Sequence, residues 1–233
     1  MTRVNEFGQP IGAPLGTWTS PPRPPSTRLE GATVTLEPLD PDLHVGPLFA
    51  AFEGAPDSLW TYMAFGPFDG PAGLAATLRS MKESPDFIPY AVVTDDGPHG
   101  FASYLRIAPA EGVIEIGAIT LSPRLQRTTA ATEAIYLMLR NAFDLGYRRC
   151  EWKCDDLNEP SRAAALRFGF TYEGDFRQAT HYKGRNRDTA WYAIVDREWQ
   201  ALDLAFQRWL SADNFDEKGR QRKTLRQMRE GND

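Results

Sequence analysis

A loop rich in basic and hydroxyl side chains, SPRLQRTT at 122–129, leads into a helix predicted to begin near Ala130. The amides of a first helical turn have no partner inside the helix, and they point outward together with the positive end of the helix dipole. The loop adds two guanidinium groups and the helix start adds hydroxyl donors, namely Arg124, Arg127, Thr128, Thr129 and Thr132. This combination suits a phosphate or pyrophosphate. Because every helix has such an end, the loop alone leaves an ordinary helix start as an equal alternative.

A single charged residue, Glu115, interrupts the apolar run VIEIGAITL at 113–121. Near the centre of a domain, loss of hydration would raise the pKa of this carboxyl toward the range in which a general base works. Glu115 is therefore a candidate proton acceptor. The alternative is a carboxylate that faces solvent on a half-exposed sheet.

The surrounding elements predict how these groups are positioned. Apolar residues at three-and-four spacing form one stripe along the helix after the loop, and Gly146 ends that helix. A strand at 150–154 and a short helix at 158–168 follow. The order strand, helix, strand predicts a parallel pair joined by a crossover helix.

The rest of the chain predicts an antiparallel sheet with helices beside it. Alternating and apolar runs indicate further strands at 33–39, 87–94, 101–108, 171–182 and 189–196. Helical patterns lie at 42–52, 71–83 and 198–210, with DDGPHG and KGRNRD as connecting turns and an aromatic-rich irregular stretch at 58–70. The fold class is therefore α+β, a mixed α/β arrangement.

Four segments together resemble the GCN5-related N-acetyltransferase superfamily: QRTTAATEA at 126–134, LMLRNAFDLGYRR, WKCDDLNEPSRAAALRFGFTYEGDFRQ and GRNRDTAWYAI. Within it they are most similar to the branch that acetylates ribosomal-protein N-termini. The resemblance covers about 32–199 and is strongest from 113 onward. It implies a single domain with a central, mostly antiparallel sheet, a splayed parallel pair at the cofactor site and flanking helices. It also implies acetyl-CoA as co-substrate.

The resemblance assigns the loop to the pyrophosphate of acetyl-CoA. The superfamily pattern is Gln or Arg, two residues, Gly, one residue, then Gly or Ala, which Gln126 and Ala131 match. Thr129 stands where Gly is usual, and its Cβ obstructs the closest backbone approach. The implied contacts are Gln126, Arg127, Thr128, Thr129, Ala130, Ala131 and Thr132. The amides of Ile119, Thr120 and Leu121 are expected to reach the thioester carbonyl if the sheet splays there.

The remaining catalytic assignments also come from the resemblance. Asn158 is placed where the branch contacts pantetheine, and Ser161 where a hydroxyl meets the coenzyme sulfur. The alternative is a helix start in which Asn158 is the N-cap and Ser161 is only tolerated. The Glu that serves the branch as base is replaced by Thr180, so His181 is a second candidate base beside Glu115.

We therefore expect an acetyl-CoA-dependent N-acetyltransferase in which a primary amine attacks directly. The acceptor is a protein N-terminus or a small-molecule amine, and the aromatic stretch is expected to wall its site. A catalytically silent acyl-CoA-binding or partner-recruiting module is the alternative, because Gly is replaced at Thr129 and Glu at Thr180. A nucleotide-binding protein is disfavoured, since no Gly-rich loop ends in Gly-Lys-Ser or Gly-Lys-Thr.

Composition and length bound the organisation. The chain has 233 residues, 42% of them hydrophobic, which suffices for a sizeable core. We expect a Pro-rich extended arm at 1–31 that lies along the domain or a neighbouring subunit, or is a mobile tail. The acetyltransferase domain follows at 32–199, and a helix with a charged, solvated tail at 200–233. The sequence does not decide whether the chain forms a homodimer.

Charge, apolar runs and metal-ligating residues exclude several classes of protein. The net charge of −5 argues against a nucleic-acid binder. No run of eighteen apolar residues and no signal-peptide core occur, which favours a cytoplasmic protein without membrane contact. Cys150 and Cys154 share one strand face and are expected in the core. Three histidines without ligand spacing predict no metal site.

Overall fold

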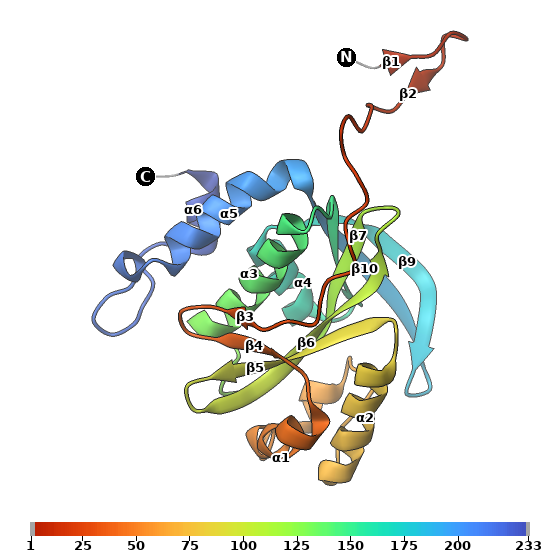
Figure 1. The fold of residues 1–233 in the computed structure, drawn as a ribbon. Coiled ribbons are helices and arrows are strands. Elements are labelled where there is room, and N and C mark those ends of the chain that lie inside the picture. The colour runs from red at the N-terminus through yellow and green to blue at the C-terminus, as the bar shows by residue number, and fades with distance from the viewer. Residues whose placement is uncertain (1–2, 232–233) are drawn as a thin grey trace.

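An eight-stranded sheet forms the centre of the protein in the computed structural model, which describes residues 3–231 (Figure 1). The strand order is β3-β4-β5-β6-β7-β8-β10-β9, and every neighbouring pair is antiparallel except β7 and β8. The strands are β3 Leu29–Glu30, β4 Thr35–Pro38, β5 Phe87–Thr94, β6 Gly97–Ala108, β7 Val113–Leu121, β8 Arg149–Asp155, β9 Thr171–Tyr182 and β10 Arg185–Val195. The predicted α+β class and the parallel pair are therefore confirmed.

Helices cover both faces of the sheet and divide the core in two. The larger core lies under α3 Thr129–Asp144, α4 Glu159–Phe168, α5 Asp196–Leu210 and α6 Leu225–Glu230, and it contains both cysteines. The smaller core lies on the other face under α1 Pro41–Ala51, the 3-10 turn η1 Asp57–Trp60 and α2 Pro71–Glu83. The alternation of β7 explains this division, since Ile114 and Ile116 join the larger core whereas Glu115 points to the opposite face.

The parallel pair β7–β8 is short. Only Val113, Ile114 and Glu115 have partners on β8, and the last registered pair is Glu115 with Glu151. Two residues later β7 contains a bulge, where its register against β6 shifts and Ala118 adopts φ +50°. A bulge bends its strand and increases the local twist. The second half of β7 therefore has an edge toward β8 that no strand occupies.

Two hairpins are tighter than the sequence indicated. DDGPHG was expected to be a turn, but β6 already begins at Gly97, which adopts φ +118°. KGRNRD was expected to be a loop, but β10 begins at Arg185, so the turn is Lys183–Gly184. In β10 the exposed polar residues Arg185 and Asn186 extend the ladder. In β6 the added residues are instead Gly97 and Pro98, which are half-buried, and His99 and Gly100, which are buried.

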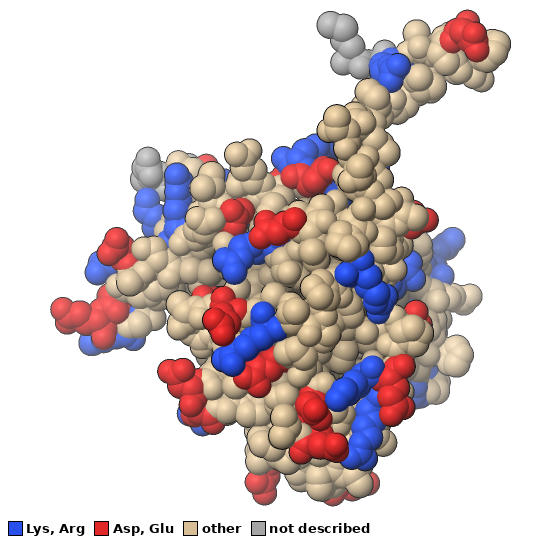
Figure 2. All heavy atoms as spheres, viewed as in Figure 1, with Lys and Arg blue, Asp and Glu red and all other residues tan. Residues whose placement is uncertain are grey.

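The N-terminal arm has two parts. A small hairpin of β1 Arg3–Val4 and β2 Pro10–Ile11 projects away from the domain (Figures 1 and 2). From Trp18 onward the chain lies along the domain. The Trp18 indole donates to the carbonyl of Gly146 at 3.1 Å, and the Tyr147 hydroxyl donates to that of Pro22 at 3.1 Å.

The C-terminal segment differs from the solvated tail that its charge suggested. Asn214 is buried and donates to the carbonyls of Trp209 and Lys223 at 3.0 and 3.1 Å, while Leu225 of α6 is 1% exposed in the larger core. One buried amide and one buried leucine thus anchor a segment whose other residues are mostly polar. Average composition could not reveal this, because few residues make the contacts.

Lysine and arginine alternate with acidic residues over the face shown in Figure 2, where no large area of one sign gathers. Across residues 3–231, no helix combines the length and apolar character needed to cross a membrane. Nor do the side chains of that range form a group of three or more suited to a metal ion.

Candidate active site

The loop before α3 has three backbone amides available for a ligand. The N-cap Thr128 accepts a hydrogen bond from the Ala131 amide at 3.1 Å through Oγ1, and the same hydroxyl donates to the Leu125 carbonyl at 2.7 Å. The Thr132 hydroxyl donates to the Thr128 carbonyl at 3.3 Å. Within the described chain no acceptor pairs with the amides at positions 127, 129 and 130. They sit at the positive end of a sixteen-residue helix, which favours an anion.

The two arginines of this loop differ in their ion pairs. Arg127 is exposed, adopts φ +62° and has no ion pair within residues 3–231. Arg124 instead pairs with Asp96 in the β5–β6 turn. Hydrogen bonds from Thr94 and His99 lower the pKa of Asp96 to about 2, so this carboxylate is charged near neutral pH. Arg127 is thus the better placed cation for a phosphate.

The other predicted coenzyme contacts lie along the open edge of β7. Ile119, Thr120 and Leu121 follow the bulge, where β7 pairs with β6 on one side and with no strand on the other. The Gln126 side chain donates to the Leu121 carbonyl at 2.9 Å and so ties the loop to the end of this strand. The loop before α3 and the open edge of β7 are therefore contiguous, as an extended ligand such as acetyl-CoA requires.

Glu115 is buried and anchored through one oxygen. The residue is 5% exposed, so the solvent-facing alternative is wrong. Lys153 of β8 donates to Oε2 at 2.8 Å, and the Arg106 Nε lies 3.6 Å from the same oxygen. Burial raises the pKa of the Glu115 carboxyl above its usual value, and the charge of Lys153 opposes that rise. The expected direction of the pKa shift is thus present.

The two oxygens of Glu115 differ in their contacts. Across residues 3–231, no hydrogen bond reaches Oε1, and the ion pairs of Glu115 with Lys153 and Arg106 are given by their contacts to Oε2. It faces Gly117, where an added Cβ would lie 3.1 Å from it and 2.8 Å from the Leu105 side chain. Glycine at 117 therefore keeps this side of the carboxylate open, directly before the bulge at Ala118.

Ser161 lies at the start of α4. Asn158 is the N-cap, since its Oδ1 accepts from the Ser161 amide at 3.2 Å. The Ser161 hydroxyl accepts from the Trp152 indole at 3.0 Å, and it lies beside the Cys154 thiol, whose pKa burial raises. The capping role expected as the alternative is therefore present. A role of Ser161 at the coenzyme sulfur and a pantetheine contact of Asn158 stay predictions.

His181 lies apart from Glu115. It is exposed on the edge strand β9, opposite Asn186 of β10, and two strands separate β9 from β7. Thr180 pairs with Arg187 in the same ladder. The structure thus brings Glu115, the open edge of β7 and the α3 loop together, and leaves His181 on the far side of β8 and β10.

The aromatic stretch 58–70 packs into the smaller core and also reaches the site. Trp60 makes ring contacts with Phe52, Phe65 and Phe68, and this cluster packs against the bulge residue Ala118. The β9–β10 turn closes over the same stretch, because Lys183 donates to the Trp60 carbonyl at 2.8 Å. The stretch is therefore a packed loop that also borders the bulge.

Sequence reasoning missed the charged residues around Glu115. Lys153, Arg106 and Glu151 come from neighbouring strands, and the ring of Trp191 lies 3.7 Å from the Lys153 ammonium. One signal was present: Glu151 and Lys153 alternate with the cysteines, which places both charges on the face opposite the cysteines. The partner strand could not be identified from that alternation.

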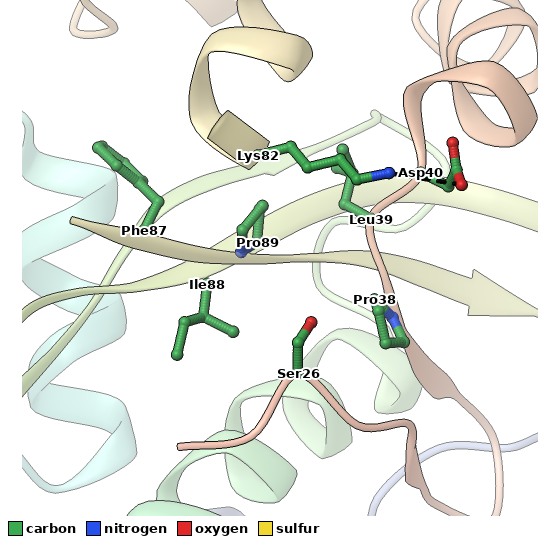
Figure 3. A pocket seen from close by; sticks show the side chains of 8 residues that line it. All are labelled: Ser26, Pro38, Leu39, Asp40, Lys82, Phe87, Ile88 and Pro89. Carbon is green, nitrogen blue, oxygen red and sulfur yellow. Dashed lines mark ion pairs between the residues drawn. The ribbon is translucent and has the colours of Figure 1, made fainter. Parts of the chain in front are cut away.

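A small cavity of about 230 Å³ lies elsewhere, at the β4–β5 side of the sheet (Figure 3). Lys82 extends toward Asp40 across its mouth, with 3.5 Å between Nζ and Oδ2. Its other lining residues come from the N-terminal arm, β5 and the end of β4, with β6 between β5 and β7. The cavity therefore does not belong to the site around Glu115.

Comparisons with known proteins show the family to which this fold belongs. The family model described as an acetyltransferase (GNAT) domain matches residues 33–171. A GCN5-related N-acetyltransferase from Brucella melitensis has 44% sequence identity over 93% of this chain and 100% of its own, with a TM-score of 0.90. A probable GNAT-family acetyltransferase from Chromobacterium violaceum has 43% identity over 82% of this chain and 98% of its own, with a TM-score of 0.78.

A more distant structure shares the fold alone. It is the Salmonella typhimurium acetyl transferase that modifies the N-terminal serine of ribosomal protein L7/L12, with 21% identity over 71% of this chain and 96% of its own, and a TM-score of 0.62. No curated protein is similar to this chain at a significant level. The matched family domain covers more than half of the chain, and its members use acetyl-CoA. The chain therefore belongs to the GCN5-related N-acetyltransferase family and is an N-acetyltransferase.

Proposed function

We propose that the protein transfers the acetyl group of acetyl-CoA to a primary amine by direct attack, with Glu115 as general base. One observation carries this proposal. Glu115 is buried where the β7–β8 pairing ends, its Oε2 is held by Lys153, and its Oε1 accepts no hydrogen bond within the described chain. A carboxylate with one anchored and one open oxygen is positioned to accept a proton.

The proposed step transfers one proton and exchanges one bond. The amine nitrogen forms a bond to the acetyl carbonyl carbon, the carbon–sulfur bond breaks, and the sulfur leaves as a thiolate. The amine proton passes to Oε1 of Glu115 directly or through one water. The Ser161 hydroxyl is the candidate donor to the thiolate, and Asn158 the candidate pantetheine contact. No cysteine carries the acetyl group, because burial of Cys150 and Cys154 raises the pKa of both thiols.

The α3 loop and the open edge of β7 support the coenzyme assignment. The amides at 127, 129 and 130 and the Arg127 side chain have no partner within residues 3–231, and they offer donors to a pyrophosphate. The hydroxyls of Thr128 and Thr132 and the Ala131 amide are used within the helix cap, so their contribution is to hold the loop. Ile119, Thr120 and Leu121 are the candidates to meet the thioester and the pantetheine arm.

The acceptor we propose is a primary amine of a protein N-terminus or of a small molecule, in line with the ribosomal-protein branch. Two elements support a walled acceptor site beside Glu115, namely the aromatic stretch around Trp60 and the β9–β10 turn that contacts it. A panel of amines would rank acceptor classes by kcat/KM, with release of free thiol from acetyl-CoA as the readout. It would contain peptides with free N-termini, polyamines and amino acids. Absence of thiol release with every amine would contradict the proposal.

Glu115→Gln tests the base directly. The amide keeps the shape of the side chain but removes its basicity, so turnover at neutral pH should fall by roughly two to four orders of magnitude. Part of the loss should return at high pH, where more of the amine is already neutral. His181→Ala is the matched control and should retain most activity. If Glu115→Gln is nearly fully active and His181→Ala is inactive, the general base is His181 and not Glu115.

A further inference from the structure

The proposed base, Glu115, lies opposite a second carboxylate, that of Glu151. Glu115 and Glu151 are registered partners on β7 and β8, and both are 5% exposed. Neighbouring strands lie about 4.8 Å apart, so two like charges on one face of this pair repel strongly in a buried setting. Without a compensating cation, one of the two carboxyls would take up a proton. A protonated Glu115 could not accept one from an amine.

Lys153 supplies that cation. It follows Glu151 by two residues and therefore lies on the same face of β8. Its ammonium is 2.8 Å from Oε2 of Glu115 and 2.7 Å from Oε2 of Glu151, and its side chain is 7% exposed. The ammonium lies over the Trp191 ring, 3.7 Å from the ring centroid, and this cation–π contact stabilises its charge.

The two carboxylates depend on Lys153 unequally. Glu151 also pairs with Arg149, whose Nε lies 2.9 Å from its Oε1. The other cation near Glu115 is Arg106, 3.6 Å away on a side chain that is 59% exposed, where solvent screens its charge. Lys153 is therefore the buried counter-ion of Glu115, whereas Glu151 has a second one.

We propose that Lys153 is a positioning residue for acetyl transfer: it fixes Glu115 through Oε2, keeps that carboxylate ionised and leaves Oε1 to accept the amine proton. This inference rests on the proposed function of Glu115. Glu151 works in the opposite direction, since it shares the ammonium of Lys153 and adds a negative charge beside Glu115. The charged groups that face Glu115 are Lys153, Glu151 and Arg106.

The direction of the pH effect follows from these contacts. Burial raises the pKa of Glu115, and Lys153 lowers it. Removal of the ammonium should therefore raise this pKa further, by about 1–2 units for an opposite charge at this distance. A smaller fraction of Glu115 would then be ionised at a given pH. Removal of the Glu151 charge should lower the pKa of Glu115 instead.

The test is a titration of Glu side-chain carboxyls by 13C NMR in the full-length protein without ligand. The Glu115 signal is identified by its absence from Glu115→Gln. Lys153→Met keeps the length of the side chain without its charge and should raise the midpoint by about 1–2 pH units. Lys153→Arg retains the charge and should shift the midpoint by less than half as much. Glu151→Gln should lower it.

An unmoved midpoint in Lys153→Met, or a rise in Glu151→Gln, would overturn the inference. If Lys153→Met does not fold, as loss of one partner from a buried ion pair can cause, Glu151→Gln still decides, because a midpoint that does not fall in this variant would overturn the inference. With the best amine of the panel as acceptor, the fall of kcat/KM at acidic pH should shift in the same direction as the Glu115 midpoint. If Lys153 had a purely structural role, its substitution would lower kcat/KM by the same factor at every pH.

Failure of this inference and failure of the proposed function give different results. If Glu115→Gln remains active, Glu115 is not the base, whatever the titration shows. If Glu115→Gln is inactive and the midpoint does not respond to Lys153→Met, the base is retained and only the role of Lys153 is wrong.

Discussion

At the scale of single residues, the site depends on side chains whose polar atoms are only partly used by the protein. Glu115 has one anchored and one open oxygen. Ser161 is similar, because its hydroxyl accepts from Trp152 and its amide donates to Asn158, which together hold the side chain at the first turn of α4. A hydroxyl held in this way can meet a leaving sulfur without reorganisation.

Ser161→Ala should lower kcat while the dissociation constant of acetyl-CoA stays nearly unchanged. A group that meets the sulfur as charge develops acts mainly in the transition state. Rapid-reaction turnover and calorimetric titration of acetyl-CoA separate the two quantities. Ser161→Thr keeps a hydroxyl and serves as the matched control. Equal losses in binding and in rate for Ser161→Ala would show that the residue only supports the helix start.

At the scale of elements, the α3 loop combines a helix dipole with the cation of Arg127, which has no ion pair within the part of the chain that the structure describes. The cap at Thr128 orients the first turn, and the φ of +62° at Arg127 turns the chain immediately before it. Thr129 replaces the usual glycine of the family pattern, yet its own amide has no acceptor within the described residues. The loop thus keeps donors for an anion despite the added Cβ.

Arg127→Glu should weaken acetyl-CoA binding by about 1 kcal/mol or more, roughly fivefold, because a charge-assisted contact becomes a repulsion. Calorimetric titration at fixed ionic strength measures this. Arg208→Glu makes the same charge change at an exposed position of α5, and it should leave the dissociation constant unaltered. Equal effects of the two variants would show that net charge, and not a contact of Arg127, governs the affinity.

At the scale of the whole molecule, the N-terminal arm contributes to stability through its second part. Hydrogen bonds in residues 3–16 stay within the arm, whereas residues 18–28 contact the domain through Trp18, through the Pro22 carbonyl and through the buried Pro21 and Pro24. A hairpin of two-residue strands adds little by itself. The two parts of the arm are therefore expected to contribute unequally to the stability of the fold.

Deletion of 1–16 should leave the melting temperature within about 1 °C of the parent. Deletion of 1–28 should lower it by about 4–8 °C, the effect of roughly 2 kcal/mol lost from a protein of this size. Thermal unfolding followed by circular dichroism measures both. A large loss on deletion of 1–16 alone would show that the hairpin has a partner, such as a second copy of the chain.

Much of the fold was predictable because its signals are local. The α3 stripe, the range of α2 and the strand β7 follow from spacing within a few residues, and the predicted bounds of α2 and β7 match those of the structure. The turns before Gly97 and Arg185 lie within the predicted segments but are shorter, because the Gly, Pro and polar residues that open β6 and β10 are also the residue types of turns. Most of the segment after Leu210 is exposed, as its charge predicted, but the charge did not reveal the two buried residues, Asn214 and Leu225, that anchor it.

The sequence by itself determined the order of the elements, the helix N-terminus after the apolar strand and the isolated carboxylate of Glu115, since each depends on neighbours in the chain. Only the tertiary structure decided where β7 and β8 stop pairing and which cation meets Glu115. Lys153 lies 38 residues from Glu115. Such a contact depends on strand register and on the bulge at Ala118, which arise from packing of the whole sheet and leave no periodic trace in the sequence.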